Sequence, residues 1–303
     1  MELKTLNDLL PYCLSTGVVQ TMAVIKAEDD HTLTAVAKAK AAGAINAVLV
    51  GDAAVIADLL VEIGEKVEDY EIVNVVDATE ATKAAINMVH EGKVDFLMKG
   101  TLETKELMSA IVSKDNGMRT GKLMSKFDFV ETPGYHKLFV LTDSALNTKP
   151  DAAAKKQIIQ NSLDVLKTMG MSKPKVAVLA ASETLNPKLP ESTDAAALKE
   201  MWENGEFTDC YLEGPISIDL ALEPESVRIK KYDSPVGGDA DILVCPDLVS
   251  GNLMGKGMLI TGARAAGIIV GAKVPVVLMS RSASVEDKFQ SIILGAIASQ
   301  KGE

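Results

Sequence analysis

Short apolar runs alternate with longer amphipathic segments along most of this chain. Residues 21–27 form one such run, and residues 30–42 follow with apolar positions at helical spacing that stop before Gly43. Short apolar runs are typical of buried strands, recurrence at i, i+3 and i+4 is typical of helices, and glycine is typical of a helix end. Repeated alternation of the two predicts a mostly parallel sheet with helices on both faces.

The same alternation of apolar runs and amphipathic segments continues through both halves of the chain, without visible sequence repetition between them. We expect the two halves to meet near residues 142–150. The expected strands are residues 21–27, 46–52, 70–76, 95–100, 137–143, 175–180, 210–215, 241–246, 267–271 and 275–279. The expected helices are residues 6–13, 30–42, 53–64, 78–91, 104–112, 151–170, 193–204, 251–266 and the segment from 288 onward.

Polar side chains crowd the end of one of these runs. Residues 276–279 are apolar, Ser280 and Arg281 follow at once, and Asp287 precedes a helical pattern. Ligands of open α/β sheets bind beyond strand ends, and helix N-termini attract anions, so the segment predicts an anion site with a carboxylate beside it. Two plainer interpretations stay open: Ser284 and Asp287 also fit a helix N-cap, and Arg281 also fits a solvated surface charge.

Small and polar residues follow five other expected strands as well. Any one of these groups is also typical of a simple turn, but six at strand ends together predict a single lined crevice. The candidate ligand-contacting residues in the five groups are Lys99, Gly100 and Thr101; Asp143, Ser144 and Asn147; Asn186 and Pro187; Gly214 and Pro215; and Ser250, Gly251 and Asn252.

Composition restricts the classes of function. The 303 residues are 47% hydrophobic and 24% charged, which is ordinary for a globular protein and sufficient for two α/β domains. A net charge of −11 argues against nucleic-acid or membrane binding, so a phosphate-bearing ligand needs a local positive site. The three cysteines and three histidines lack metal-site or disulfide spacing. With no apolar signal or membrane-spanning run, we expect a cytoplasmic enzyme or binding protein.

Known phosphate-binding and nucleophile motifs are missing from the sequence. It contains no P-loop, no dinucleotide-binding fingerprint after a strand and no nucleophile elbow. Six other motifs, taken together and in order, carry a resemblance. They are Met98-Lys-Gly-Thr, Thr142-Asp-Ser-Ala-Leu-Asn, Glu183-Thr-Leu-Asn-Pro-Lys, Glu213-Gly-Pro-Ile-Ser-Ile-Asp, Ala240-Asp-Ile-Leu-Val-Cys-Pro-Asp-Leu-Val-Ser-Gly-Asn and Met279-Ser-Arg-Ser-Ala-Ser-Val-Glu-Asp-Lys.

Over nearly its full length the chain resembles the phosphate acetyl/butyryltransferases, and the phosphate butyryltransferase branch in particular. The resemblance implies an α/β fold of two three-layer α/β/α domains with an interdomain cleft, as in isocitrate/isopropylmalate dehydrogenase. It implies a first domain of residues 1–143 plus 288–303, a second of residues 144–287, and a homodimer. The implied reaction is acyl-CoA + phosphate ⇌ acyl phosphate + CoA, with CoA as a substrate and without metal, tightly bound cofactor or covalent acyl-enzyme.

The resemblance also implies roles for three residues. Ser280 matches the serine that hydrogen-bonds the reacting carbonyl, Arg281 the arginine that holds phosphate, and Asp287 the aspartate that acts as base for the CoA thiol. These roles are chemically coherent. A thiol attacks as its thiolate, a developing oxyanion needs a hydrogen-bond donor, and a guanidinium grips phosphate with two parallel bonds.

This chain departs from the acetyl-specific branch after the strand at residues 95–100. That branch carries arginines there, whereas this sequence has Lys99 and Lys105, so the residues that bind CoA stay open. Glu213 stands where many relatives have aspartate. Arg119 and Lys122 fit either phosphate contacts or a solvated basic loop.

Several functions remain to be distinguished. The leading hypothesis is a phosphate acyltransferase for butyryl or a similar short chain, with phosphate acetyltransferase as the alternative. A metal- and NAD-dependent decarboxylating dehydrogenase needs clustered aspartates, and the chain has none at D-x-x-x-D spacing. A non-catalytic acyl-CoA binder need not keep Ser280, Arg281 and Asp287, yet all three are present. An acyl-carrier-protein phosphate acyltransferase needs a basic docking surface, which the acidic composition of this chain disfavours. Met98, Met254 and Met258 fit either an acyl pocket or the core.

Overall fold

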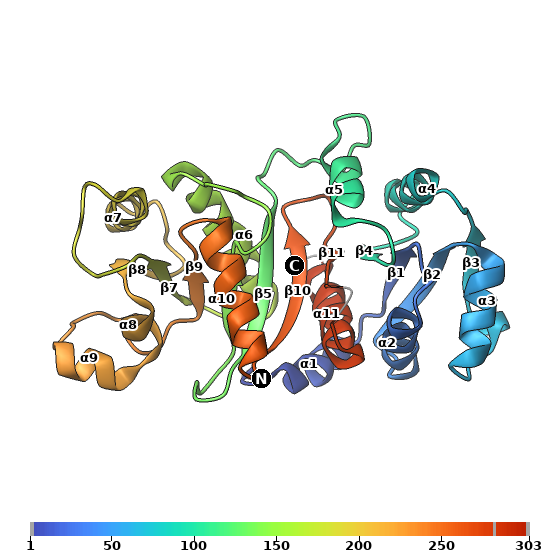
Figure 1. Ribbon diagram of the computed structural model, residues 1–303, viewed down its shortest axis with the longest axis horizontal. Helices are drawn as coiled ribbons and strands as arrows, with labels where there is room; N and C mark the ends of the chain where they lie inside the picture. The colour runs from blue at the N-terminus through green and yellow to red at the C-terminus, as the bar shows by residue number, and fades with distance from the viewer. Residues whose placement is uncertain (1–2, 281–282, 301–303) are drawn as a thin grey trace.

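A single mixed sheet forms the centre of the molecule. The computed structural model describes residues 3–280 and 283–300. The strands follow the order β3-β2-β1-β4-β11-β10-β5-β6-β9-β7-β8 along the long axis (Figure 1). They are β1 (Gln20–Ile25), β2 (Ile45–Gly51), β3 (Glu71–Asn74), β4 (Phe96–Lys99), β5 (Ser125–Glu131), β6 (Phe139–Thr142), β7 (Lys175–Leu179), β8 (Tyr211–Ile216), β9 (Ile242–Val244), β10 (Arg264–Val270) and β11 (Val276–Val277).

Most helices fall near the expected positions, but α8 and α9 were not expected, and α10 ends at Ile260, before the expected residue 266. They are η1 (Leu6–Asp8), α1 (Leu9–Ser15), α2 (Asp30–Ala41), α3 (Ala53–Glu62), η2 (Val67–Asp69), α4 (Ala78–His90), α5 (Thr104–Val112), α6 (Ala152–Thr168), α7 (Pro190–Glu203), α8 (Ile218–Leu222), α9 (Pro224–Lys230), α10 (Leu248–Ile260) and α11 (Val285–Ala298). Aspartate side chains cap several of them; Asp29, Asp77 and Asp151 each accept a first-turn backbone N–H.

Parallel pairing dominates the two ends of the sheet, as expected, but the middle is antiparallel. β5 pairs antiparallel with both β10 and β6, and β10 pairs antiparallel with β11. The sequence expectation missed β5 entirely. Polar residues interrupt its apolar ones although most of the strand is buried, so its sequence does not read as a continuous apolar run.

Strand alternation divides the core between the two faces of the sheet. On one face, a large cluster joins the sheet to α1, α2, α6 and α11 and includes Phe127 and Phe129 of β5. On the other face, one cluster packs beneath α4 and α5, and a separate one, which includes Val130, lies beneath α8 and α10. This second face therefore has a seam at its middle, between two separately packed groups of helices.

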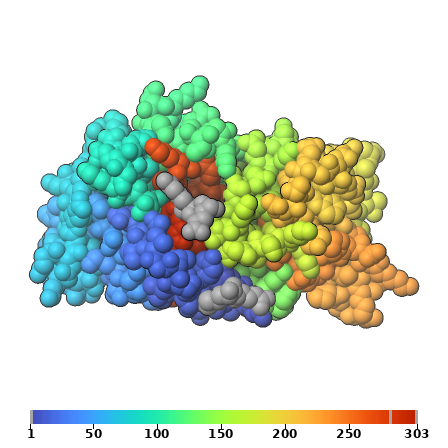
Figure 2. Space-filling model, turned by 180° about the vertical axis from the view of Figure 1, so that it is seen from behind, coloured from blue at the N-terminus to red at the C-terminus, as the bar shows by residue number. Residues whose placement is uncertain are grey.

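The C-terminal segment lies between the two halves of the molecule. Helix α11 packs against α1, α2 and β10, and Figure 2 shows the red C-terminal segment between the blue-to-cyan and the yellow-to-orange parts. One continuous sheet runs through both expected domains, so the boundary between residues 143 and 144 stays a prediction. Among the described residues, no helix is both long enough and apolar enough to cross a membrane.

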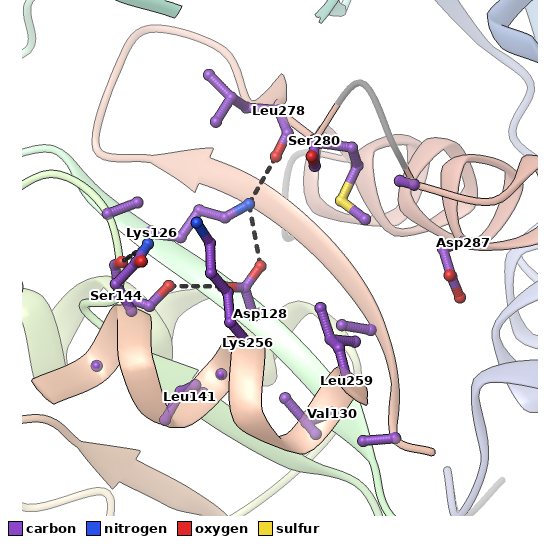
Figure 3. Close-up of a pocket in the computed structure, with 18 of the residues that line it drawn as sticks. Lys126, Asp128, Val130, Leu141, Ser144, Lys256, Leu259, Leu278, Ser280 and Asp287 are labelled. Atoms are coloured by element: carbon purple, nitrogen blue, oxygen red, sulfur yellow. Dashed lines mark hydrogen bonds and ion pairs between the residues drawn. The ribbon is translucent and has the colours of Figure 1, made fainter. Parts of the chain in front are cut away.

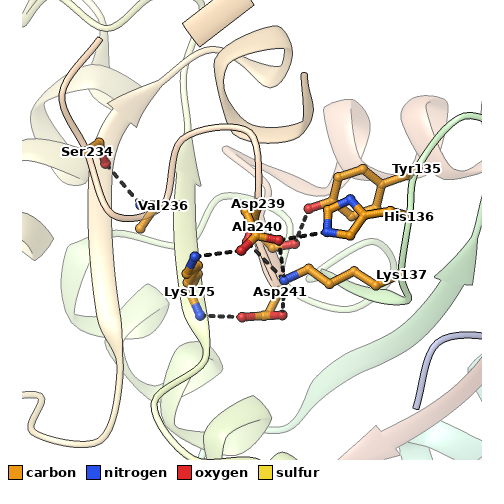
Figure 4. A network of polar contacts seen from close by, with 9 residues as sticks. All are labelled: Tyr135, His136, Lys137, Lys175, Ser234, Val236, Asp239, Ala240 and Asp241. Atoms are coloured by element: carbon orange, nitrogen blue, oxygen red, sulfur yellow. Dashed lines mark hydrogen bonds and ion pairs between the residues drawn. The ribbon is translucent and has the colours of Figure 1, made fainter. Parts of the chain in front are cut away.

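A network of charges ties together the starts of three neighbouring strands, β6, β7 and β9 (Figure 4). The Lys137 ammonium lies 2.6 Å from the Asp241 carboxylate, and Lys175 lies 2.6 Å from Asp239. The backbone N–H of Lys175 also donates to Asp241 at 2.7 Å. Although partial burial opposes ionisation of Asp239, its two lysine partners hold its pKa below the ordinary value of 3.8.

We predict that the substitution Asp239→Asn destabilises the protein in a pH-dependent way. Because the folded pKa lies below 3.8, this carboxylate stabilises the fold above pH 3.8, and the contribution disappears as pH falls below that value. Asp239 is 37% exposed, so we expect a loss of only about 1 kcal/mol at pH 7. Urea unfolding at several pH values measures it.

Glu225→Gln provides the control for that experiment. Glu225 pairs with Arg228 on the exposed surface of α9, so its loss is expected to leave the free energy of unfolding unchanged within the error of the measurement. A difference between wild type and Asp239→Asn that stays constant from pH 7 to pH 3 would contradict the proposed linkage.

Candidate active site

A cavity of about 530 Å³ lies at the seam (Figure 3). Its walls come from β5, β6, α10 and the segment that joins β11 to α11. Polar groups line it near β11, and apolar side chains line the remainder. The residues are Lys126, Asp128, Val130, Leu141, Ser144, Ala145, Gly251, Asn252, Gly255, Lys256, Leu259, Ile260, Ala263, Ala265, Leu278, Met279, Ser280, Ala283, Ser284 and Asp287.

Ser280 connects this cavity to a smaller one of about 60 Å³. The second cavity is lined by Lys99, Gly100 and Thr101 at the end of β4, together with Lys288 of α11. Parallel pairing of Val277 with Met98 aligns the ends of β11 and β4 and so brings these residues together. The structure thus unites the expected groups at residues 99–101 and 280–287, with Ser280 itself exposed.

Tight backbone packing shapes the end of β4. A Cβ atom at Gly100 would lie 1.8 Å from the carbonyl oxygen of Lys26, so only glycine fits there. The buried Lys99 ammonium donates to the carbonyls of Gly100 and Leu102 at 3.1 and 3.2 Å. Lys99 therefore holds the loop that carries Thr101, whose hydroxyl donates to the Lys26 carbonyl at 3.3 Å.

Asp287 both caps α11 and faces the main cavity, so the two interpretations of this residue are compatible. The Ser284 hydroxyl accepts from the Asp287 N–H at 3.1 Å and donates to Oδ2 of the Asp287 carboxylate at 2.7 Å. The other oxygen, Oδ1, is buried and has no hydrogen-bond partner among the described residues. Arg264 lies 3.6 Å from Oδ1, too far for a hydrogen bond but close enough to offset its charge.

Arg264 was not anticipated as a neighbour of the site. It begins β10, and its guanidinium also lies 3.8 Å from Glu286. Burial opposes ionisation of Glu286, but the ammonium of Lys38 and the amide of Gln290 lower its pKa below the ordinary value. Two carboxylates and two cations therefore lie around the first turn of α11, with Asp287 and Arg264 more buried than Glu286 and Lys38.

Asp143 organises the loop after β6 instead of presenting its carboxylate to the cavity. It is buried, and Oδ1 accepts from the backbone N–H groups of Lys126, Ala145 and Leu146 at 3.0–3.2 Å. Oδ2 accepts from the backbone N–H of Asn147 at 3.0 Å and from its side-chain amide. These bonds fix the position of Ser144, which does line the cavity.

A second polar group in the cavity was missed by the sequence analysis. The Ser144 hydroxyl donates to Asp128 at 2.8 Å, and Asp128 pairs with the Lys126 ammonium at 3.0 Å. Figure 3 shows Lys256 reaching into the same cavity from α10. Within the described part of the chain, Lys256 forms no ion pair, so it adds an uncompensated positive charge to a site in an otherwise acidic protein.

The remaining candidate residues are divided between the main cavity and other parts of the molecule. Gly251 and Asn252 line it, whereas the adjacent Ser250 lines a neighbouring pocket and caps α10. Asn186 and Pro187 are exposed in the loop before α7. Gly214 and Pro215 are buried in the edge strand β8, which β9 and β7 separate from β6. Arg281 lies outside the described residues, and the ligand-binding roles of all these positions stay predictions.

The described residues supply neither an activated thiol nor a clustered metal-ligand set. All three cysteines are buried. Burial raises the pKa of Cys13 and Cys210 to about 11, and it also raises the pKa of Cys245. Among residues 3–280 and 283–300, no three His, Cys, Asp or Glu side chains are grouped to hold a metal ion. The chemical roles expected for Ser280 and Asp287 stay predictions.

Comparison with known proteins gives the family. A model described as "Phosphate acetyl/butaryl transferase" matches residues 56–296. The chain belongs to this family. The phosphate butyryltransferase of Clostridium acetobutylicum is 38% identical over 296 residues, covering 97% of this chain and 98% of that protein. The phosphate acetyltransferase of Rhizobium meliloti is 38% identical over 270 residues, covering 89% and 85% respectively.

A solved structure agrees with the family assignment. The branched-chain phosphotransacylase from Enterococcus faecalis V583 superimposes with a TM-score of 0.82 at 30% identity, covering 94% of this chain and 100% of that one. The expected α/β fold is confirmed, and the protein is an acyltransferase of the phosphate acetyl/butyryltransferase family.

Proposed function

We propose that this phosphate acyltransferase moves a short acyl group, butyryl or one of similar size, between CoA and inorganic phosphate. The observation that carries the proposal is the single cavity that Ser280 and Asp287 share with positively charged side chains. CoA, acyl-CoA, phosphate and acyl phosphate are its small-molecule partners, and no tightly bound cofactor, nucleic acid or membrane takes part. We place the enzyme in the cytoplasm.

The proposed reaction is a direct transfer within a ternary complex. Asp287 accepts the thiol proton of CoA, and the resulting thiolate attacks the carbonyl carbon of the acyl phosphate. A carbon–sulfur bond forms, the carbon–oxygen bond to phosphate breaks, and phosphate leaves with the bonding electron pair. The Asp287 residue lines the main cavity, which supports its role as the acceptor of the proton. Ser280 would donate to the carbonyl oxygen, and Arg281 would hold the phosphate.

The apolar part of the cavity suits an acyl chain. Val130 and Leu141 rise from the sheet, and Leu259 and Ala263 lie at the end of α10 and just beyond it. Met98 lines only the smaller cavity and Met254 a separate pocket, so they do not form this wall. Because one methylene in an apolar pocket is worth only about 1–3 kcal/mol, acetyl remains an alternative substrate.

The first test is phosphate-dependent release of free CoA thiol from acetyl-, propionyl-, butyryl- and isobutyryl-CoA, without added metal. We expect release from all four, with kcat/KM highest for a four-carbon chain because the longer chain contacts the apolar wall. Highest kcat/KM for acetyl-CoA would favour phosphate acetyltransferase. Binding of acyl-CoA without any release would favour a non-catalytic binder and contradict the proposal.

Asp287→Asn tests the proposed base. Loss of a general base is expected to lower kcat by about 10²–10⁴-fold, because asparagine keeps the shape but cannot take the thiol proton. The measurement is steady-state kinetics of CoA release and of the reverse reaction. Glu286→Gln is the matched control: it changes a carboxylate in the same helical turn that does not line the cavity, so kcat should stay within about threefold. Wild-type kcat in Asp287→Asn would remove this residue from the mechanism.

We also propose that the enzyme is a homodimer in which a second copy covers α10. Val249, Leu253 and Ile260 of this helix are 59, 67 and 86% exposed. An apolar helix face of this kind is typical of a protein–protein contact. The family resemblance makes an identical subunit the expected partner.

Leu253→Glu is expected to shift the protein from dimer to monomer, because it places a charge in the centre of the apolar face. Light scattering coupled to size exclusion measures the molar mass. Val61→Glu on α3, where Val61 is similarly exposed at 65%, is expected to leave the mass unchanged. A dimeric Leu253→Glu variant, or a monomeric wild type, would contradict this interface.

A further inference from the structure

Two charged residues occupy strand positions that face the main cavity. Successive side chains of β5 alternate, so Phe127 and Phe129 enter the core while Lys126, Asp128 and Val130 point to the opposite face. The Lys126 side chain is 7% exposed and that of Asp128 is 13% exposed. The floor of the cavity therefore carries a nearly buried ion pair.

This pair holds together three segments of the site. The Lys126 ammonium donates to the Leu278 carbonyl at 2.6 Å and lies 3.0 Å from Asp128 (Figure 3). The second Asp128 oxygen accepts from Ser144 at 2.8 Å. The chain continues from Leu278 through one residue to Ser280. The contacts thus connect the loop after β6, the strand β5 and the segment that carries Ser280.

The neighbouring strand leaves room for the pair. Gly267 of β10 is the register partner of Asp128. A Cβ atom at this position would lie 2.1 Å from Oδ1 of Asp128 and 2.4 Å from Nζ of Lys126. Three strands therefore cooperate in placing the pair: β5 supplies both charges, β10 supplies the space, and the end of β11 supplies the acceptor carbonyl.

Stability alone does not account for this arrangement. Removing two charges from water is costly, and replacing a buried ion pair with apolar residues is often neutral or stabilising. Val130, Leu141 and Ala265 show that apolar side chains already fill adjacent parts of the cavity wall. What the charges provide, and apolar residues would not, is a directed bond to the Leu278 carbonyl.

We propose that Lys126 and Asp128 are positioning residues, which fix the Leu278–Ser280 segment so that the Ser280 hydroxyl meets the reacting carbonyl. The inference rests on the proposed acyl transfer, in which Ser280 is the hydrogen-bond donor. Asp128 orients the ammonium, Ser144 orients Asp128, and neither lysine nor aspartate takes part in bond making. A misplacement of about 1 Å in such a donor can cost on the order of 10²-fold in rate.

The test is a double-mutant cycle that combines Lys126→Met with Ser280→Ala. In the wild-type background, Lys126→Met should lower kcat by about 10–100-fold, with KM for each substrate changed by less than about threefold. In the Ser280→Ala background, the same substitution should lower kcat by less than about threefold, because the group it positions is already missing. Equal losses in the two backgrounds would overturn the inference.

Lys155→Met is the matched structural control. Lys155 is a lysine of α6 with a 2% exposed side chain, paired with Asp194 at 2.7 Å, and neither residue lines the main cavity. Its loss should lower the melting temperature by an amount similar to that of Lys126→Met while kcat stays within about threefold. An equal fall in kcat in the two variants would show a general effect of stability and overturn the positioning role.

Asp128→Asn provides a second route if Lys126→Met does not fold. It keeps the size of the side chain and an acceptor for Ser144, but it weakens the hold on the ammonium, so kcat should fall by about tenfold with the same dependence on Ser280. Unchanged kcat would overturn the inference. An inactive wild-type enzyme would overturn the proposed function as well, whereas an active wild type with unaffected variants overturns only the positioning role.

Discussion

The position of Ser280 depends on the backbone hydrogen bonds that insert β11 between β4 and β10. Val276 and Val277 pair with Leu97 and Met98 on one side and with Ile269 and Ile268 on the other. Two residues of strand thus anchor a segment from the far end of the chain at the centre of the sheet. Ladder pairing fixes strand register. It therefore also fixes the point at which the segment after Val277 leaves the sheet.

The seam between the two helix groups follows from the same insertion. β10 and β5 run antiparallel to their neighbours, so the sheet changes direction where they lie. On one face α4 and α5 cover the first part of the sheet, and α8 and α10 cover the second part. The cavity lies at the edge of the second group, where α10 forms one of its walls. In doubly wound sheets, ligands similarly bind where the direction of winding changes.

Pattern reasoning recovered most of the sheet and helices because their apolar periodicity is strong. The motif residues at positions 99–101 and at Ser280 and Asp287 were found as well, and the fold brings them to adjoining cavities. Strand β5 was missed because Lys126 and Asp128 interrupt its apolar pattern, and both residues line the cavity. Asp143 was predicted to contact a ligand, but its hydrogen bonds stabilise the loop after β6. The spacing of residues in the sequence does not distinguish these two roles.

Local rules thus failed where function replaced packing as the reason for a residue. Lys126 and Asp128 disrupt an apolar strand pattern, at a desolvation cost that folding alone does not require. A comparable arrangement is found at Asp287. The Arg264 guanidinium lies 3.6 Å from a buried oxygen of this carboxylate and offsets its charge without forming a hydrogen bond to it. Both arrangements stabilise a buried charge by placing an opposite charge close to it. A sequence pattern records the identity of such residues, but only the three-dimensional pairing of β5, β10 and α11 shows which charges lie close together.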